Sequence, residues 1–167
     1  MKEAIRTCAP MFSMTRMVKE YTTNFYIPAI QHGLQIEQNN YEQARVLAKW
    51  KEQIRQAWGN LAVYVNARRD GQLSLGETID VRTWIRAVKL RPEDLSVELV
   101  YGDEKDDLVI PRFALPMEYI RQEQDGSYRY EIRLKPDESG SIVYGVRVLP
   151  KHAALAGKHE MGLVRWA

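Results

Sequence analysis

The chain has 167 residues, which is enough for one compact domain with an accessory element. Its 24 basic and 22 acidic residues give a net charge of +2 and are mixed along the sequence, which argues against nucleic-acid binding. The single cysteine, Cys8, excludes an intrachain disulfide framework, and there is no apolar run long enough to cross a membrane. We therefore expect a cytoplasmic protein that binds neither membranes nor nucleic acids.

The first part of the chain is expected to be helical. Residues 1–9 have the character of a helix end, which Pro10 breaks. The clearest helix is predicted from Ser13, its N-cap, to Tyr26, with Pro28 ending it. Its apolar stripe follows the three-and-four spacing of one helix face and comprises Met14, Met17, Val18, Tyr21 and Phe25.

A second amphipathic helix is predicted over Tyr41–Trp58, after a polar connector over 29–40 whose last residue, Asn40, can act as N-cap. The residues expected on its inner face are Tyr41, Ala44, Leu47, Ala48, Lys51, Ile54 and Trp58, with Lys51 interrupting the stripe. Trp50 and Trp58 are interpreted as packing groups in preference to sugar platforms.

From Leu61 onward the hydrophobic period changes from 3.6 to 2, which indicates strands separated by turns. The predicted strands are 61–67, 78–89, 96–101, 114–124, 128–134 and 141–149, with a short last strand at 162–166 at a sheet edge or a tail lying across the sheet. Asp125-Gly126 signals a hairpin. The expected fold is mainly β: an antiparallel, immunoglobulin-like or fibronectin-like sandwich preceded by two amphipathic helices.

Alternation predicts which strand residues face the core. The residues expected to be buried are Tyr128, Tyr130, Ile132 and Leu134; Val97, Leu99 and Tyr101; and Ile142, Tyr144, Val146 and Val148. Ser96, Glu98 and Arg147 are expected on the solvated side.

Two separated stretches resemble one protein family. In FSMTRMVKEYTTNFYIPA, Phe12 and Ser13 are followed by Arg16 and then by the pair Glu20-Tyr21. These residues resemble the closing catalytic-domain helix of bacterial and archaeal α-glucan (glycogen or maltodextrin) phosphorylases. The segments YGVRVLPKH (144–152) and HEMGLVRWA (159–167) resemble the terminal segment of the same enzymes.

The resemblance implies that residues 1–60 are the end of a catalytic domain with a connecting helix, and that residues 61–167 are a C-terminal β-sandwich domain. It also implies that the rest of the catalytic domain is a partner, along with an α-glucan and a second copy of the protein. Such enzymes transfer glucosyl units to phosphate with pyridoxal phosphate on a lysine, and no lysine here has the expected small-residue surroundings. We expect no catalytic, cofactor-binding or metal-binding residue in this chain, and no activity from it alone.

The sharper alternative is a glucan-binding module, and Trp84 is its candidate residue. If Ile79, Val81, Thr83, Ile85 and Ala87 are buried, Trp84 lies between Arg82 and Arg86 on the opposite face. The ring could be a sugar platform or a subunit contact. The interpretation that we favour has the ring covered by the helices or by the rest of the enzyme. A third alternative is a protein-interaction domain unrelated to sugar.

Two polar clusters are interpreted as ordinary surface. His152, His159 and Glu160 lack the spacing of a zinc site. The acidic loop of Asp103, Glu104, Asp106 and Asp107 lacks the residue order of an EF-hand and is expected to be a solvated hairpin tip.

Overall fold

The structure, a computed structural model, describes residues 2–66, 78–105, 108–135 and 142–167. The chain divides into two compact units, Met1–Lys49 and Trp50–Ala167. We describe each unit separately. Among the described residues, no helix is both long and apolar enough to span a bilayer.

The N-terminal unit is helical. It contains α1 (Lys2–Met11), α2 (Met14–Tyr21), the π-helical turn η1 (Thr22–Tyr26) and the first part of α3 (Ile27–Trp58). The predicted cap is confirmed, because the Ser13 hydroxyl accepts a hydrogen bond from the backbone N–H of Arg16 at 3.2 Å. Pro10 lies inside the last turn of α1 and does not stop it.

The prediction that Pro28 ends the helix is wrong. The wide turn η1 lies just before it, where the Ile27 N–H bonds to the Thr22 carbonyl five residues back. Proline has no N–H, and its ring crowds the carbonyl four residues back, so a locally wider turn lets the helix continue through it.

The predicted polar connector over 29–40 is also mostly helical. The interruption is confined to Gln38–Tyr41, where Asn39, Asn40 and Tyr41 have positive φ angles of 53°, 55° and 60°. Asparagine tolerates this left-handed region better than most residues, so Asn39-Asn40 is a suitable place for the break.

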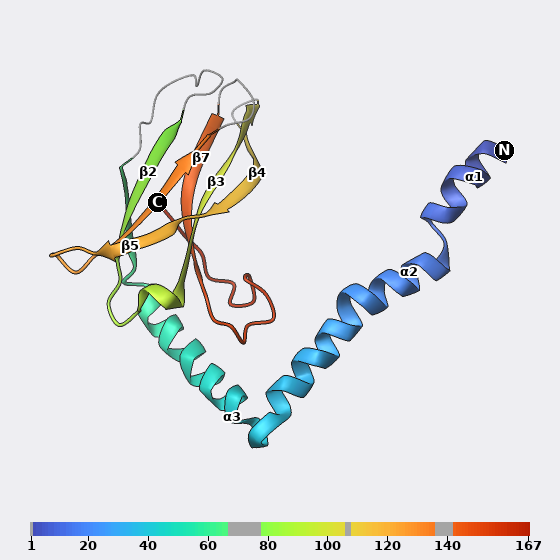
Figure 1. Ribbon diagram of the computed structural model, residues 1–167, viewed down its shortest axis with the longest axis horizontal. Helices are drawn as coiled ribbons and strands as arrows, with labels where there is room; N and C mark the ends of the chain where they lie inside the picture. Colours follow the sequence, from blue (N-terminus) through green and yellow to red (C-terminus); the bar gives the residue numbers. More distant parts are fainter. Residues whose placement is uncertain (1, 67–77, 106–107, 136–141) are drawn as a thin grey trace. The chain divides into compact units, whose positions relative to one another are not determined.

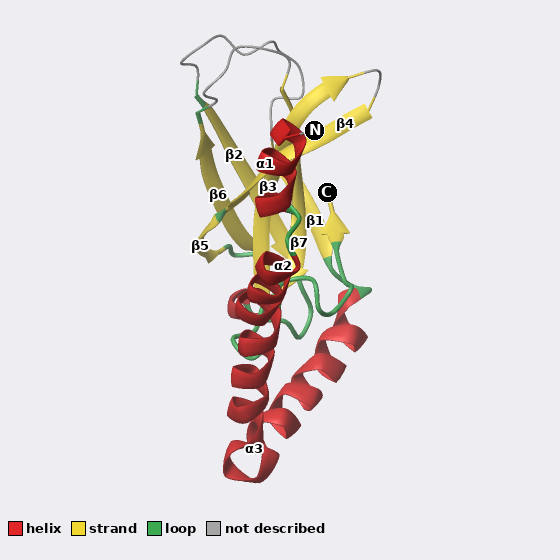
Figure 2. Ribbon diagram, turned by 90° about the vertical axis from the view of Figure 1, so that its right-hand side faces the viewer, coloured by secondary structure: helices red, strands yellow, loops and turns green. Residues whose placement is uncertain are grey.

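The second unit is confirmed as two four-stranded antiparallel sheets (Figures 1 and 2). The first has the order β1-β2-β6-β5, and the second has the order β4-β3-β7-β8. The strands are β1 (Ala62–Asn66), β2 (Ile79–Arg86), β3 (Leu95–Lys105), β4 (Leu108–Pro116), β5 (Glu118–Gln122), β6 (Tyr128–Leu134), β7 (Ile142–Pro150) and β8 (Arg165–Trp166). The predicted short last strand is therefore present, paired at the edge with β7.

One predicted strand, 114–124, is in fact two strands in different sheets. β4 pairs with β3, β5 pairs with β6, and the chain changes sheets at Pro116-Met117. The buried Met117 donates its N–H to the Val97 carbonyl at 2.8 Å, which fixes the crossing point. The predicted acidic hairpin tip lies partly outside the described residues, since 106 and 107 are not described; Asp103 and Glu104 belong to β3.

The core lies between the two sheets. Its best buried side chains come from the four central strands and are Val81, Thr83, Ile85, Val97, Leu99, Tyr130, Leu134, Val146 and Val148. The predicted alternation therefore holds along β2, for Val97 and Leu99 on β3, and for Val146 and Val148 on β7. It fails on β3 at Glu98, which is buried, and the predicted core residues Tyr101 and Tyr144 are only half-buried. On β6 only Tyr130 and Leu134 are fully buried, while Tyr128 and Ile132 are half-buried.

The last turns of α3 reach one end of the sandwich (Figure 1) and bury Trp50, Ile54, Ala57 and Trp58. The predicted inner face is thus shifted, because Trp50 replaces Lys51 on it. Lys51 is instead ion-paired with Glu160 in the C-terminal tail. The Trp50 indole N–H donates to Asp94 Oδ1 at 2.8 Å in the short turn η2 (Pro92–Asp94).

Candidate functional site

Trp84 lies on the outer face of the first sheet, between the cross-strand residues Tyr64 and Arg129. The side chain is half-buried, with the Arg129 guanidinium 6.0 Å from the ring centroid, within cation–π range. The group that lies over the Trp84 ring is therefore an arginine from the neighbouring strand of the same sheet.

The two arginines beside Trp84 are already paired. Arg82 lies 3.3 Å from the Glu131 carboxylate, and Arg86 lies 3.2 Å from the Asp125 carboxylate. Arg129 bonds to Glu131 as well. The shallow hollow next to Trp84 is lined mainly by polar and charged residues of the β5–β6 hairpin. This face carries two aromatic side chains, Trp84 and Tyr64, within a network of paired charges, and its hollow is wide open to solvent.

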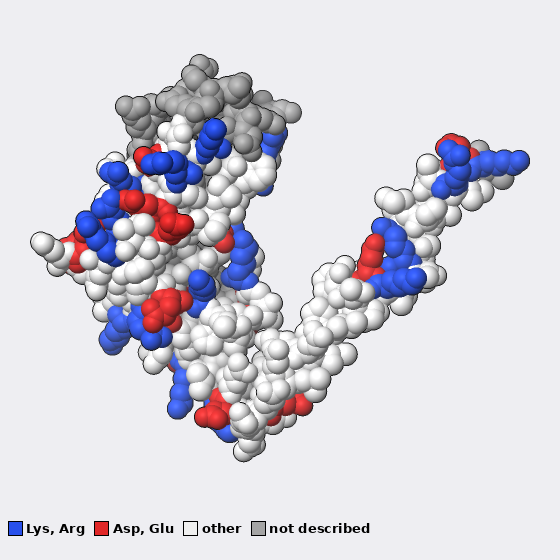
Figure 3. Space-filling model, viewed as in Figure 1, with Lys and Arg blue, Asp and Glu red and all other residues white. Residues whose placement is uncertain are grey.

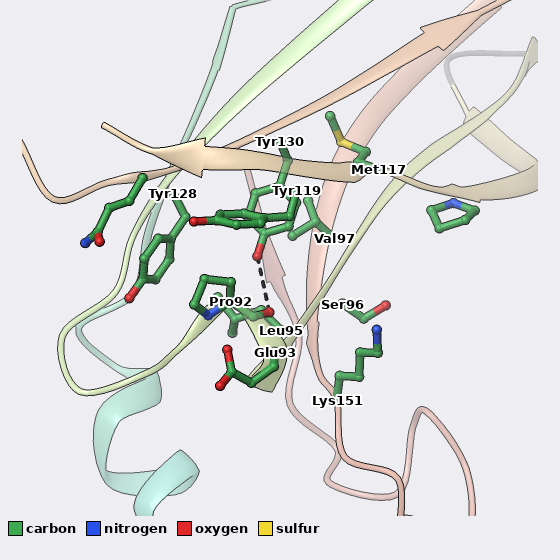
Figure 4. Close-up of a pocket in the computed structure, with 12 residues that line it drawn as sticks. Pro92, Glu93, Leu95, Ser96, Val97, Met117, Tyr119, Tyr128, Tyr130 and Lys151 are labelled. Carbon is green, nitrogen blue, oxygen red and sulfur yellow. Dashed lines mark hydrogen bonds between the residues drawn. The ribbon is translucent and has the colours of Figure 1, made fainter. Parts of the chain in front are cut away.

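A hollow of similar volume, less open than the one beside Trp84, lies at the opening between the two sheets, and we call it the tyrosine pocket (Figure 4). Its volume is about 600 Å³, within the ~300–1,000 Å³ range of small-molecule sites. Its lining residues come from η2, β3, the β4–β5 crossing, β5, β6 and the end of β7: Pro92, Glu93, Leu95, Ser96, Val97, Pro116, Met117, Tyr119, Gln122, Tyr128, Tyr130 and Lys151.

Three tyrosine rings form one wall of this pocket. Tyr119 of β5 pairs across the sheet with Tyr130 of β6, and their rings are 5.5 Å apart; Tyr119 and Tyr128 are 6.2 Å apart. Both contacts are edge-to-face, a favourable geometry for aromatic rings. Tyr119 lines the hollow and remains 45% exposed, so part of its ring is accessible to a ligand (Figure 4).

The other two tyrosines are fixed by hydrogen bonds to the loop before β3. The Tyr128 hydroxyl donates to the Leu90 carbonyl at 3.0 Å, and the Tyr130 hydroxyl donates to the Pro92 carbonyl at 3.3 Å. Burial, reinforced by the neighbouring tyrosines and by Glu93, raises the pKa of Tyr130. Burial, together with Tyr119, Glu93 and Asp94, also raises the pKa of Tyr128. Both phenols therefore stay protonated and keep these bonds at neutral pH.

Polar groups lie across from the rings. Figure 4 shows Ser96 and Lys151 together on one side and Glu93 below the Tyr119 ring. A phosphate-bearing cofactor would need several cations, whereas this pocket has one lysine and one carboxylate. The residues of the tyrosine pocket do not fit pyridoxal phosphate.

In the histidine cluster of the tail, His152 packs against the end of α3. The His152 ring lies 4.8 Å from Trp50, and its Nδ1 accepts a hydrogen bond from the Ala154 N–H. Glu160 bonds to Lys51 and accepts from the Ala156 N–H. In the part of the chain that the structure describes, no three His, Cys, Asp or Glu side chains are grouped to hold a metal ion.

The helical unit carries an uncovered apolar stripe. Phe25 is 60% exposed and Leu34 is 59% exposed, and the sequence from Tyr21 to Ile36 contains no charged residue. On the face seen in Figure 3, charged side chains are correspondingly sparse along this stretch. An apolar surface of this length is typical of a protein–protein interface.

The structure thus defines an antiparallel two-sheet domain preceded by a helical segment. The family model described as "Glycogen phosphorylase C-terminal domain" matches residues 58–167, and the chain belongs to this family. This confirms the resemblance inferred from the two sequence stretches.

Curated relatives align with nearly the whole chain. It is 30% identical to the maltodextrin phosphorylase of Thermococcus litoralis over 171 residues, covering 99% of the chain and 20% of the relative. The glycogen phosphorylases of Mycobacterium bovis and Mycobacterium tuberculosis are 29% identical, with the same coverage. The chain spans about a fifth of the length of these relatives. No solved structure matches it.

The sequence did not reveal the tyrosine pocket, although one signal was present. Tyr128 and Tyr130 occupy inward positions where phenylalanine would pack without a hydroxyl to satisfy. Their rings meet Tyr119 only because β5 is a separate strand paired with β6.

Proposed function

We propose that this chain is the C-terminal accessory part of an α-glucan phosphorylase, and that it has no catalytic site of its own. The observation that carries the proposal is the alignment of 99% of the chain with about a fifth of enzymes named maltodextrin and glycogen phosphorylase. The parent enzyme would release glucose 1-phosphate from α-1,4-glucan and phosphate in the cytoplasm. Its pyridoxal phosphate would be held by residues outside this chain.

In this proposal residues 1–60 complete the catalytic domain and connect it to the sandwich, residues 61–167. The uncovered apolar stripe, which the exposed side chains of Met14 and Met17 extend towards the N-terminus, supports this role, because so many apolar side chains are stabilised by burial against a partner. The partner is the rest of the catalytic domain. A surface for homo-oligomer assembly is a second part of the proposal.

The strand order supports the finer fold assignment. If β4 is named C′ and the other seven strands are lettered A to G in chain order, the first sheet has the order A-B-E-D and the second has the order C′-C-F-G. That is the arrangement of immunoglobulin-like sandwiches. We propose that the domain is of this type, without the cysteine pair of antibody domains.

The proposal is tested by combining the 167-residue chain with the catalytic region of its parent enzyme. The chain alone, incubated with pyridoxal phosphate, maltodextrin and phosphate, should give no glucose 1-phosphate. The two parts together should co-purify and give it. Turnover by the chain alone would contradict the accessory role.

A matched pair of variants tests the docking surface. Phe25→Asp places a charge on the apolar stripe and should abolish co-purification, because a carboxylate would be buried without a partner. Thr23→Asp, two residues away on another side of the same turn, should leave co-purification intact. Equal behaviour of the two variants would mean that the stripe is not the docking surface.

A further inference from the structure

The tyrosine pocket is lined by residues of the second unit alone and shares none with the helical stripe. We propose that it binds a segment of α-glucan, with a pyranose ring stacked on the exposed ring of Tyr119. This inference extends the accessory role and rests on the proposal that the chain is part of an α-glucan phosphorylase. It moves the glucan contact from Trp84 to the opening between the two sheets.

The walls of the pocket match the two kinds of surface that a pyranose presents. The C–H groups on the ring faces are apolar and gain from burial against an aromatic ring, while the hydroxyls around the rim need donors and acceptors. Tyr119 and Tyr128 supply the aromatic wall. Glu93, Ser96 and Lys151 supply an acceptor, a hydroxyl and a donor on the facing side (Figure 4).

The aromatic wall is set before a ligand arrives. Tyr128 and Tyr130 are held by their bonds to the Leu90 and Pro92 carbonyls, and the Tyr119 ring rests edge-on against both. A preformed wall loses little conformational entropy on binding. On the facing side, Lys151 has no ion-pair partner among the described residues, so its ammonium group is available to a sugar hydroxyl.

Other ligand classes fit less well. The lining has a single cation, Lys151, so the pocket is not a strong anion site; its one carboxylate, Glu93, is ion-paired with Arg91 at 3.0 Å. A helical peptide would need a continuous apolar groove, whereas charged and hydroxyl groups line one side here. On the Trp84 face, which also carries Tyr64, the neighbouring Arg82 and Arg86 already hold carboxylate partners, and the Arg129 guanidinium lies over the Trp84 ring.

The test measures binding of maltoheptaose to the full 167-residue chain by isothermal titration calorimetry. The wild-type chain should bind, and Tyr119→Ala should weaken binding about tenfold or more, since a central aromatic contact dominates small interfaces. Tyr119→Phe keeps the ring and should bind within about threefold of wild type. Tyr119→Phe keeps both edge-to-face contacts and should keep the thermal midpoint of the parent. Tyr119→Ala loses them and should lower the midpoint by a few degrees, with the protein still folded at the temperature of the titration, because Tyr119 is 45% exposed.

Trp84→Ala and Tyr64→Ala are the matched controls, since both remove an aromatic side chain from the outer face of the same sheet. Both should bind maltoheptaose like the wild type. Loss of binding with Trp84→Ala but not with Tyr119→Ala would overturn the proposal in favour of the Trp84 face. Absence of maltoheptaose binding by a folded wild-type chain would also overturn it.

The outcome is separable from that of the proposed function. A chain that restores glucose 1-phosphate formation with the catalytic region but does not bind maltoheptaose would refute only the glucan pocket. A chain that binds maltoheptaose through Tyr119 but never associates with the catalytic region would refute only the accessory role. If Tyr119→Ala disrupts that association and leaves maltoheptaose binding unchanged, the pocket is a protein contact and the glucan proposal fails.

Discussion

The Glu98 carboxylate is held between two cations on the outer face of the second sheet. Arg147, its cross-strand neighbour on β7, donates from Nε and Nη2 at 2.8 and 2.7 Å, and Lys158 of the tail lies at 3.2 Å. The residue is only 7% exposed, because the tail covers this part of the sheet. Our prediction of a solvated Glu98 is therefore wrong: the covering tail, and not the strand alternation, decides its burial.

Glu98 should make stability depend on pH. Burial by itself would raise the pKa of Glu98, but the bonds from Arg147 and Lys158 prevail and lower it below the usual range of a glutamate. The folded state therefore binds this proton less readily than the unfolded state. The stabilisation should be complete above the unfolded pKa and disappear as the pH falls through the folded pKa.

The measurement is the free energy of unfolding in urea between about pH 3 and pH 7. Glu98→Gln should lose about 1.5–3 kcal/mol at pH 7, the usual contribution of hydrogen bonds to a charged group. Its deficit should shrink at the acid end. A deficit that is constant with pH would show that the Glu98 charge is not the cause.

Trp84→Ala should destabilise the fold only modestly. The half-buried ring on the outer face is expected to contribute about 1–2 kcal/mol, less than the ~3–5 kcal/mol of a buried tryptophan. Ile85→Ala, the next residue on β2 and 0% exposed, should cost about 2–5 kcal/mol and is the control. Comparable urea midpoints for the two variants would mean that the Trp84 ring is covered as fully as a core side chain.

At the scale of elements, the end of α3 offers a comparison between two buried tryptophans. The Trp50 indole N–H has Asp94 as its acceptor, whereas the Trp58 indole nitrogen is buried without a hydrogen-bond partner among the described residues. Asp94 also accepts the Arg91 N–H at 3.0 Å, and its own carbonyl accepts the Lys151 N–H at 2.8 Å. This aspartate therefore connects the helix end, η2 and the end of β7.

Trp50→Phe should lower the free energy of unfolding by about 1–3 kcal/mol in addition to the cost of the smaller side chain, because the buried Asp94 Oδ1 loses its hydrogen-bond donor. Trp58→Phe loses a similar volume and removes an unsatisfied donor, so its cost should be clearly smaller. Thermal unfolding of the two variants, followed by near-ultraviolet circular dichroism, measures the difference. A larger loss for Trp58→Phe would contradict this account of Asp94.

Capping and turn residues correctly predicted the ends of those elements that nearby residues in the sequence determine. Ser13 caps α2, and the Asp125-Gly126 turn precedes β6, where Gly126 has a φ of 83° that favours glycine. Pro28 was misread because a wide turn before it is not visible in hydrophobic spacing. The 114–124 run was read as one strand because alternation does not show to which sheet a strand belongs.

The candidate site was less predictable than the fold, because the sequence does not show which strands pair. The tyrosine pocket joins residues from η2 to the end of β7, and only the pairing of β5 with β6 and the closing of the two sheets bring them together. The buried face of β2, by contrast, followed from alternation, as did the outward position of Trp84 between Arg82 and Arg86.

At the scale of the whole molecule, the strand order has a consequence for the way the chain folds. The central pairs β2–β6 and β3–β7 join residues about 50 positions apart, as Glu98 and Arg147 show. At about 5–20 residues per second, the ribosome needs several seconds to produce the second member of each pair. Until then β3 is paired with β4 alone, and the edge of β3 that will pair with β7 keeps its backbone N–H and C=O groups unpaired. A product truncated before Ile142 should consequently aggregate through that edge instead of folding in part.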